Sequence, residues 1–339
     1  MKEKLKILIT GGAGYIGSHT VISLINSGYK PIIVDNFCNS QEWILDQLEE
    51  LSAQKITHYN CDCTDINELD KIFKNENFGG VIHFAALKAV GESVSMPLKY
   101  YKNNIDSLLN ILELMKKFDV PNLVFSSSCT VYGEADYLPV DENHPIKTAE
   151  SPYGYTKQMC EQIINDYLKA NSNKKSVILR YFNPVGAHPS GLIGELPLGV
   201  PNNLIPFITQ TAAEIRPELT IFGDTYNTPD GTAIRDYIHV VDLSEAHVKS
   251  LDYLLKGKPS TTLNIGTGTG SSVLEAVKAF EKINGLKLNY IFGEKREGDI
   301  EQIFAKTSLS EKTLAWKTKR SLEDALKDAW KWQQFLDSK

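Results

Sequence analysis

The 339-residue sequence lacks a basic excess, a long apolar run and an even set of cysteines, and each absence excludes a class of protein. Its 36 lysines and arginines are outnumbered by 42 aspartates and glutamates, which gives a formal net charge of -6. Because nucleic-acid binding needs a basic surface, we expect no nucleic-acid partner. No segment reaches the ~18 apolar residues of a membrane-spanning helix, so we expect no membrane partner either.

The cysteines indicate reduced thiols rather than disulfides or a metal centre. They number five, and the N-terminal segment MKEKLKILIT lacks the long apolar stretch of a signal peptide, so we expect a cytoplasmic location. The triplet Cys61-Asp62-Cys63 does not have the spacing of a zinc site, and no second ligand pair completes a tetrahedral set. We therefore predict no metal site.

The first half of the chain alternates short apolar runs with segments long enough for a crossover helix. This alternation predicts an α/β fold with a parallel sheet and helices on both faces. The runs that we expect to be strands are LKILIT (5–10), PIIVD (31–35), VIHFAA (81–86), LVFSSS (123–128) and VILRYF (177–182).

The pattern changes after residue 183. Residues 184–203 contain four prolines and four glycines, which indicates a loop or domain crossover. Later segments predict helices near 203–215 and 272–284 and from about Ser321, and strands at LTIFG, DYIHVV and LNYIF. The basic cluster at 317–320 is typical of a solvated loop before that last helix. We predict a Rossmann-type doubly wound NAD-binding domain over 1–182, with a returning segment near 236–262, and a smaller mixed α/β substrate-binding domain over 183–235 and 263–339.

A glycine-rich segment, TGGAGYIG at 10–17, follows the first predicted strand and opens a predicted helix. Glycines allow a tight turn and let backbone N–H groups approach a pyrophosphate at the helix N-terminus. Asp35 ends the second strand, at the distance of about 20 residues expected of a carboxylate that binds ribose hydroxyls. That carboxylate would repel a 2′-phosphate, and no arginine follows closely to offset it, so we predict NAD rather than NADP.

The segment SPYGYTK at 151–157 places two tyrosines and a lysine at the start of a predicted helix. Tyr153 and Lys157 are four residues apart and share a helix face, whereas Tyr155 lies about 200° from each and points away. An ammonium near a phenol stabilises the phenolate and lowers its pKa, so Tyr153 is the candidate base. The third strand-end serine, Ser128, lies at the carboxyl edge of the sheet and can hold a substrate oxygen against that phenol.

The glycine-rich segment TGGAGYIG, the strand that ends in serines and the Tyr-x-x-x-Lys pair together resemble the extended short-chain dehydrogenase/reductase family. Further blocks over nearly the whole chain resemble the nucleotide-sugar 4-epimerases of that family, namely DNFCNS (35–40), HFAALKAVGES (83–93), SSSCTVYG (126–133), RYFNPVGAHPSG (180–191), PNNLIPF (201–207), GTAIRDYIHVVDL (231–243) and REGD (296–299). The resemblance implies an isomerase that interconverts UDP-galactose and UDP-glucose. It also implies a homodimer formed through the helices near 98–118 and 153–170.

The implied mechanism uses tightly bound NAD. NAD would take hydride from C4 of the sugar while phenolate Tyr153 removes the O4 proton, and the hydride would return to the other face of the rotated 4-keto sugar. Lys157 would bind the nicotinamide ribose. The resemblance implies cofactor contacts from Gly11, Gly14, Tyr15, Ile16, Gly17, Asp35, Asn36, Asn39, Ser40, Asp62, Cys63, Phe84, Ala85, Lys88, Asn103, Ser126, Tyr153, Lys157 and Tyr181.

The substrate residues that the resemblance implies lie mostly in the second half of the chain. They are Lys88, Ser128, Tyr153, Phe182, Asn183, Asn203, Leu204, Phe222, Arg235, Tyr237, Arg296, Asp299 and Ile303. The two arginines can neutralise a pyrophosphate through bidentate contacts. Phe222 can pack against a uracil, but a buried core phenylalanine is an equally good interpretation of that residue.

Three alternatives stay open. A related epimerase would act on UDP-N-acetylglucosamine, although the bulky, branched Ile303, at a position where the family more often has Tyr or Cys, favours glucose and galactose. A sugar-nucleotide dehydratase or decarboxylase would share the fold, but a dehydratase typically carries Asp-Glu where Cys129 and Thr130 stand here. A non-catalytic NAD-binding regulator would tend to lose Tyr153 or Lys157, and both are present.

Overall fold

A computed structural model describes residues 4–296 and 299–339, so Glu297 and Gly298 of the REGD block lie outside the described residues. The chain forms two compact units. Unit 1 comprises Met1–Gly133, Pro145–Tyr181 and Ser244–Leu263, and unit 2 comprises Glu134–His144, Phe182–Leu243 and Asn264–Lys339. Residues 134–144 and 236–243 therefore lie in unit 2, whereas the sequence prediction placed both with the NAD-binding domain.

Unit 1 is built on a seven-stranded sheet with the order β11-β6-β5-β4-β1-β2-β3. Its strands are β1 (Lys6–Thr10), β2 (Lys30–Asp35), β3 (Thr57–Asn60), β4 (Phe78–His83), β5 (Asn122–Ser128), β6 (Lys175–Tyr181) and β11 (Thr261–Ile265). All pairs from β3 to β6 run parallel. This strand order is that of doubly wound dinucleotide-binding folds, so the predicted fold class is confirmed.

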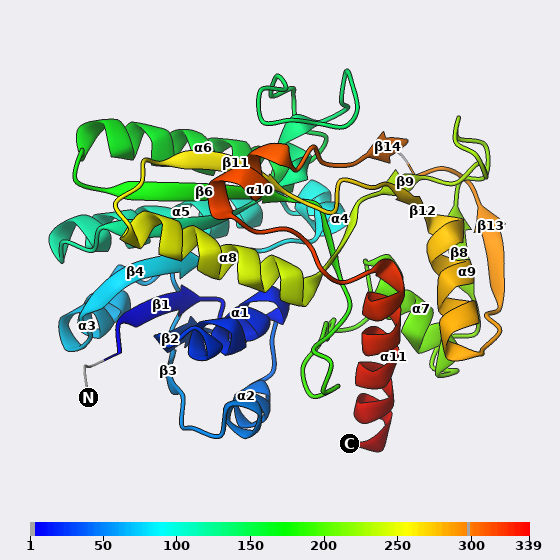
Figure 1. The fold of residues 1–339 in the computed structure, drawn as a ribbon, viewed down its shortest axis with the longest axis horizontal. Helices are drawn as coiled ribbons and strands as arrows, with labels where there is room; N and C mark the ends of the chain where they lie inside the picture. The colour runs from blue at the N-terminus through cyan, green and yellow to red at the C-terminus, as the bar shows by residue number, and fades with distance from the viewer. Residues whose placement is uncertain (1–3, 297–298) are drawn as a thin grey trace. The chain divides into compact units, whose positions relative to one another are not determined.

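Helices cover this sheet on both faces. The helical elements are α1 (Tyr15–Asn26), α2 (Ile44–Ser52), α3 (Ile66–Asn75), α4 (Val90–Ser95), α5 (Pro97–Lys117), the short 3-10 helix η1 (Cys129–Tyr132), α6 (Pro152–Ala170) and α8 (Val240–Leu255). Helices α3, α5 and α6 share one buried apolar cluster with Leu8 and Phe125 of the strands. Helices α1 and α8 lie side by side (Figure 1), joined by a hydrogen bond of 2.7 Å between the hydroxyls of Ser23 and Ser244.

Several elements differ from the sequence prediction, among them two strands of the large sheet and the segment DYIHVV. Strands β3 and β11 were not predicted; β3 has only four residues, THYN, and none of its side chains is fully buried, so it lacks an apolar signal. In DYIHVV only Tyr237–His239 is a strand, β10, and α8 begins at Val240. Within the ranges 4–296 and 299–339, no helix combines the length and apolar character needed to cross a membrane.

Unit 2 combines small sheets with helices. Its elements are β7 (Asn183–Val185), α7 (Leu204–Ala212), β8 (Leu219–Phe222), β9 (Ile234–Arg235), β10, β12 (Ser271–Ser272), α9 (Val273–Asn284), β13 (Tyr290–Gly293), β14 (Gln302–Ile303), α10 (Ser308–Leu314) and α11 (Leu322–Ser338). The sheets are β10-β7, β12-β9-β14 and β13-β8. Helices α7, α9 and α11 contribute Ile208, Phe280 and Leu326 to one buried apolar core.

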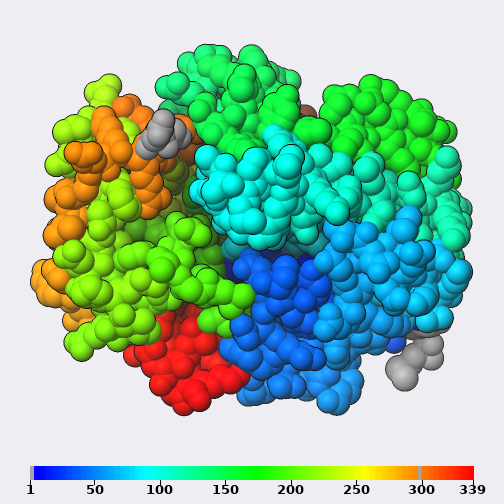
Figure 2. Space-filling model, turned by 180° about the vertical axis from the view of Figure 1, so that it is seen from behind, coloured from blue at the N-terminus to red at the C-terminus, as the bar shows by residue number. Residues whose placement is uncertain are grey.

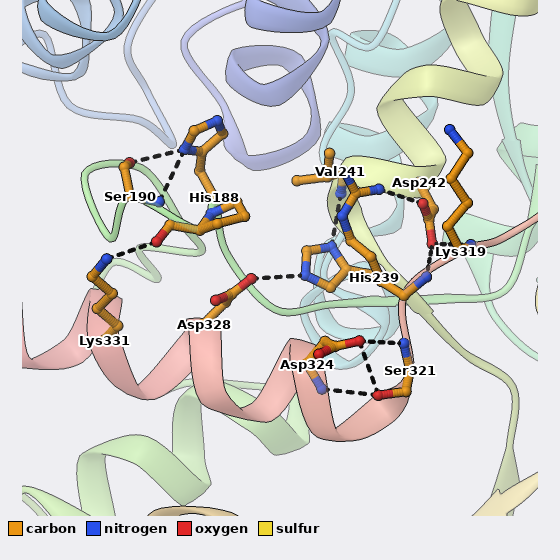
Figure 3. A network of polar contacts seen from close by, with 12 residues as sticks. His188, Ser190, His239, Val241, Asp242, Lys319, Ser321, Asp324, Asp328 and Lys331 are labelled. Atoms are coloured by element: carbon orange, nitrogen blue, oxygen red, sulfur yellow. Dashed lines mark hydrogen bonds and ion pairs between the residues drawn. The ribbon is translucent and has the colours of Figure 1, made fainter.

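A buried polar network fixes the start of α11 (Figure 3). The carboxylate of Asp242 is fully buried, accepts the backbone N–H groups of Lys319 and Arg320 at 2.9 Å each, and pairs with the Arg320 guanidinium. His239 accepts the Val241 N–H at Nδ1 (3.1 Å), and its Nε2 lies 3.2 Å from Asp328 of α11. The prediction of a merely solvated loop at 317–320 was therefore wrong for Arg320, because a buried carboxylate needs a charged partner.

Candidate active site

The glycine loop between β1 and α1 forms a backbone cradle. Gly11 has φ +67°, and its N–H donates to the carbonyl of Val34 at 2.8 Å. A Cβ on Gly17 would lie 2.1 Å from the Gly11 oxygen, so only glycine lets α1 start this close to the loop. The N-cap residue Gly14 provides no side-chain cap, which leaves the first N–H groups of α1 to a ligand. This arrangement fits a pyrophosphate at the helix N-terminus.

Asp35 connects the cradle to the turn that follows β2. Its Oδ2 accepts the N–H of Ala13 at 2.9 Å, and its Oδ1 accepts the N–H of Phe37 (2.9 Å) and the hydroxyl of Ser40 (3.0 Å). The predicted turn residues Asn36 and Asn39 lie in the same turn. Because these contacts hold the carboxylate in place beside the cradle, it is oriented to accept the hydroxyls of a ribose.

The next strand end adds the predicted adenine-side residues. Asn36 Nδ2 donates to Asp62 Oδ2 at 2.9 Å, and Asp62 Oδ1 also accepts from the backbone N–H and hydroxyl of Thr64. Cys63 is a buried free thiol, and its carbonyl accepts from Asn110 Nδ2 at 3.0 Å. Asp62 therefore lies next to the Asp35 turn, as a shared adenosine site requires.

The loop after β4 is held from two sides. The hydroxyl of Thr10 lies 2.8 Å from His83 Nδ1 and accepts the N–H of Ala85 at 3.3 Å. Burial, with a smaller effect of Lys157, lowers the pKa of His83 to about 3, so this imidazole is neutral. The hydrogen bond between His83 and Thr10 therefore joins two neutral groups.

Asn104 of α5 is a residue that the sequence analysis missed. Its side chain bonds both the N–H (2.8 Å) and the carbonyl (3.1 Å) of Leu87, and it donates to the Thr156 hydroxyl of α6 at 3.1 Å. It also accepts from the predicted Asn103 at 3.0 Å. The loop that carries Phe84, Ala85 and Lys88 is thus fixed to the helix of the candidate base. The only signal in the sequence was an asparagine at a position where the helix pattern predicts an apolar residue.

Helix α6 presents Tyr153 and Lys157 inward and Tyr155 outward. Ser151 caps the helix by accepting the N–H of Gly154, and Pro152 is the first helical residue. Tyr153 is 7% exposed and Lys157 4%, whereas Tyr155 is 45% exposed. The predicted assignment of the two tyrosines to opposite faces is therefore confirmed.

The strand-end serines surround this pair. Ser128 Oγ accepts the N–H of Thr130 at 3.2 Å, which leaves its proton free to be donated toward the Tyr153 phenol. Lys157 Nζ donates to the Ser126 carbonyl at 2.7 Å and lies 5.8 Å from the centre of the Tyr153 ring. The Ser126 hydroxyl lies 2.8 Å from the Tyr181 hydroxyl. Serine, tyrosine and lysine thus converge at the carboxyl ends of β5 and β6.

The electrostatics of this pair differ from the sequence prediction. Burial raises the pKa of Tyr153, and Tyr181 adds to this effect, while the hydrogen bond from Ser128 opposes it. Burial lowers the pKa of Lys157 to about 8. The predicted lowering of the Tyr153 pKa is wrong for this structure, because a buried phenolate loses its hydration.

Lys157→Met is expected to stabilise the cofactor-free protein at pH 7. A lysine whose pKa falls from 10.5 to about 8 on folding opposes folding by up to about 3 kcal/mol while it is charged in both states. The unfolded chain binds more protons between pH 8 and 10.5, so wild-type stability rises over that range. The melting temperature of Lys157→Met should therefore exceed that of wild type at pH 7, with the difference shrinking by pH 9.5. A variant that melts lower at pH 7 would contradict this.

A buried ion pair lies one helical turn beyond Lys157. Glu161 accepts Arg180 Nε at 3.0 Å and Nη2 at 2.6 Å, and it accepts the Ser127 hydroxyl at 2.5 Å. Arg180 Nη1 also donates to the Tyr132 hydroxyl at 3.0 Å. The sequence analysis missed this group, which joins β5, β6 and α6. The signal in the sequence was a charged residue among apolar positions, Glu161 in the helix pattern and Arg180 in the strand pattern.

Unit 2 gathers a second set of predicted residues. The guanidinium of Arg296 lies 4.1 Å from the centre of the Phe222 ring, and Phe222 is 37% exposed. Arg235 Nη2 donates to Asp299 Oδ1 at 2.5 Å, and Arg235 pairs in β9 with the buried Ile303 of β14. The core interpretation of Phe222 was therefore wrong. An arginine stacked on an exposed aromatic ring, with a second arginine held by Asp299, fits a nucleoside diphosphate.

The other predicted substrate residues lie in further groups of unit 2. Asn183 pairs with Tyr237 between β7 and β10. Phe182 is buried, and its N–H donates to the Ile265 carbonyl at 3.2 Å. Asn203 precedes α7, donates to Glu195 at 2.6 Å, and is followed by Leu204, the first residue of the helix.

Comparisons with known proteins show which family the chain resembles. Residues 7–266 match the model of the NAD dependent epimerase/dehydratase family. The chain is 49% identical over 329 residues to the UDP-glucose 4-epimerase of Bacillus subtilis, covering 97% of each chain. It is similar to the crystal structure of UDP-glucose 4-epimerase from Stenotrophomonas maltophila with bound NAD and formylated UDP-arabinopyranose (TM-score 0.96, 43% identity, 98% and 99% coverage). It is also similar to that from Bifidobacterium longum in complex with NAD+ and UDP (TM-score 0.94, 44% identity, 97% and 98% coverage).

Proposed function

The chain belongs to the NAD dependent epimerase/dehydratase family, and from this we propose that it interconverts UDP-galactose and UDP-glucose by oxidation and re-reduction at C4 of the sugar. The observation that carries the proposal is the convergence of Ser128, Tyr153 and Lys157 beside a glycine cradle, on a chain so similar to UDP-glucose 4-epimerases over its whole length. The diphosphate-compatible group in unit 2 supports the same substrate class.

The residues present fit NAD. The cradle at Gly11–Gly17 would hold the pyrophosphate, Asp35 would accept the adenosine ribose hydroxyls, and Lys157 would face the nicotinamide ribose. Bound NAD supplies the hydride acceptor and donor that an exchange at C4 requires. The uncapped N–H groups at the start of α1, which Gly17 lets approach the Gly11 turn, are the structural reason to expect a cofactor here.

The side chains of unit 1 handle the proton. Burial disfavours the Tyr153 phenolate in the protein without cofactor. The charged Lys157 and the positive charge of bound NAD would offset that cost, so that Tyr153 accepts the proton of the sugar O4 and later returns it. Ser128 has its Oγ occupied as an acceptor by Thr130 N–H, so it donates its own proton to the reacting oxygens. Lys157, with a pKa of about 8, is charged at pH 7 and compensates the phenolate charge.

The side chains of unit 2 hold the nucleotide. Arg235 and Arg296 neutralise the diphosphate, while the exposed ring of Phe222 offers an apolar surface for the uracil. The carboxylate of Asp299 keeps the Arg235 guanidinium in one orientation.

The proposal is tested by incubating the purified protein with UDP-galactose and no added cofactor. UDP-glucose should appear, because tightly held NAD is regenerated in each cycle. The same incubation with added NAD serves as a control for cofactor loss during purification. Absence of UDP-glucose under both conditions would refute the proposal.

Ile303→Cys is expected to broaden the sugar range. Ile303 is buried beside Arg235, and we propose that its branched side chain leaves little room for a 2-acetamido group. Wild type should turn over UDP-N-acetylglucosamine far more slowly than UDP-galactose. The smaller cysteine should raise kcat/KM for UDP-N-acetylglucosamine, relative to kcat/KM for UDP-galactose, roughly tenfold. Comparable turnover of both substrates by wild type would contradict this.

We also propose a homodimer and a cytoplasmic location. Leu98, at the start of α5, is 80% exposed, and Tyr155 and Met159 of α6 are exposed as well. Cyan atoms, from the part of the chain that includes α4 and the start of α5, lie on the face drawn in Figure 2, as an interface requires.

The proposed location rests on the cysteines. The five cysteines are free thiols, which fits a reducing compartment. Sedimentation of a single monomeric species at micromolar concentration would contradict the dimer, and recovery in a secreted fraction would contradict the location.

A further inference from the structure

The loop 223–231 of unit 2 holds one tyrosine ring, that of Tyr226, in a fixed position. The backbone N–H of Tyr226 donates to the Gly231 carbonyl at 2.9 Å. Gly223 has φ +80°, and a Cβ there would lie 2.4 Å from Cε2 of the Tyr226 ring, so the ring packs directly on the glycine backbone. Lys295 Nζ lies 4.3 Å from the centre of the Tyr226 ring. The ring is therefore packed between the Gly223 backbone and the Lys295 side chain.

The hydroxyl at the end of that ring is buried and has no hydrogen-bond partner among the residues that the structure describes. The Tyr226 side chain is only 8% exposed. A buried, unsatisfied hydroxyl costs about 1–3 kcal/mol, so such a group in a rigid loop calls for a ligand. Burial raises the pKa of Tyr226, which keeps the phenol protonated and able to donate at neutral pH.

The Tyr226 ring packs on Gly223, which follows Phe222, and on Lys295, which precedes Arg296, so it lies next to the proposed nucleotide site. The charged groups that act on its hydroxyl belong to that site. They are Asp299, Arg235, Arg296 and Glu301. The two arginines attract an oxyanion, whereas the carboxylate of Asp299 is already bound to Arg235 at 2.5 Å. A neutral O–H donor beside two guanidinium groups is suited to a phosphate oxygen, because phosphate oxygens only accept hydrogen bonds.

We propose that the Tyr226 hydroxyl donates a hydrogen bond to a phosphate oxygen of the nucleoside diphosphate that Arg235 and Arg296 bind. The inference rests on the proposed function, because it takes the ligand of this group to be a nucleoside diphosphate. It makes Tyr226 a phosphate-binding residue that neither the sequence motifs nor the resemblance indicated. It also explains why the ring is fixed between a glycine backbone and a lysine.

The test compares Tyr226→Phe with wild type in titration calorimetry with UDP, and in ligand-observed NMR with uridine. Loss of a hydrogen bond to a charged group should raise the UDP dissociation constant roughly tenfold, and uridine binding should be unchanged. Tyr290→Phe, which removes the hydroxyl of another unit 2 tyrosine packed against Phe292, is the matched control and should bind UDP as wild type does. Equal melting temperatures establish that the variants are folded.

The outcomes separate the inference from the proposed function. Unchanged UDP affinity in Tyr226→Phe would overturn the inference alone, provided that wild type binds UDP. Equal weakening of UDP and uridine would overturn it too, because the contact would then be to the base or ribose. Wild-type protein that does not bind UDP at all would overturn the inference together with the proposed function.

Discussion

Tyr153→Phe is expected to lower epimerase turnover by about 10²–10⁴-fold, because it removes the only atom of that side chain that can exchange a proton with the sugar. The ring is 7% exposed and packs at the carboxyl ends of β5 and β6, so the change leaves the packing intact. Turnover is measured from UDP-galactose, and bound NAD is quantified after denaturation of the same samples. NAD content should equal that of wild type.

Tyr155→Phe is the matched control for this experiment. Tyr155 lies two residues away on the opposite, exposed side of α6, so its hydroxyl takes no part in the proposed chemistry. Its turnover should equal that of wild type. If Tyr153→Phe retained full turnover, or if Tyr155→Phe lost it, the assignment of the base would fail.

Glu161→Gln should lower the free energy of unfolding by about 3–5 kcal/mol, since it leaves the buried guanidinium of Arg180 without its counter-charge. The side chains of both partners are almost fully buried, so water cannot replace the lost contact. Urea denaturation of the two proteins under identical cofactor saturation gives the difference.

An exposed ion pair in the same unit provides the control. Glu68 and Lys71 of α3 are also in contact, at 2.5 Å, but both side chains are more than half exposed. Glu68→Gln should therefore unfold at nearly the wild-type urea concentration, because exposed pairs contribute little. Equal stability of Glu161→Gln and Glu68→Gln would show that the buried pair is not a stabilising element.

Periodicity determined much of the candidate site. Glycines at 11, 14 and 17 after an apolar run can form only a tight strand-to-helix turn, and Tyr153 and Lys157 must share a helix face at a spacing of four. These inferences depend on local geometry, which the sequence contains in full. The same reasoning missed the short edge strand β3, whose pattern THYN carries no apolar signal.

The sequence by itself determined five of the seven strands of the sheet, the cradle, the carboxylate of Asp35 and the inward face of α6. Tertiary structure alone decided which way burial moves the pKa of Tyr153, that Glu161 meets Arg180, and that Phe222 is exposed beside Arg296. The physical reason is that helix and strand spacing is a property of neighbouring residues, whereas hydration and charge depend on which distant segments pack around a group.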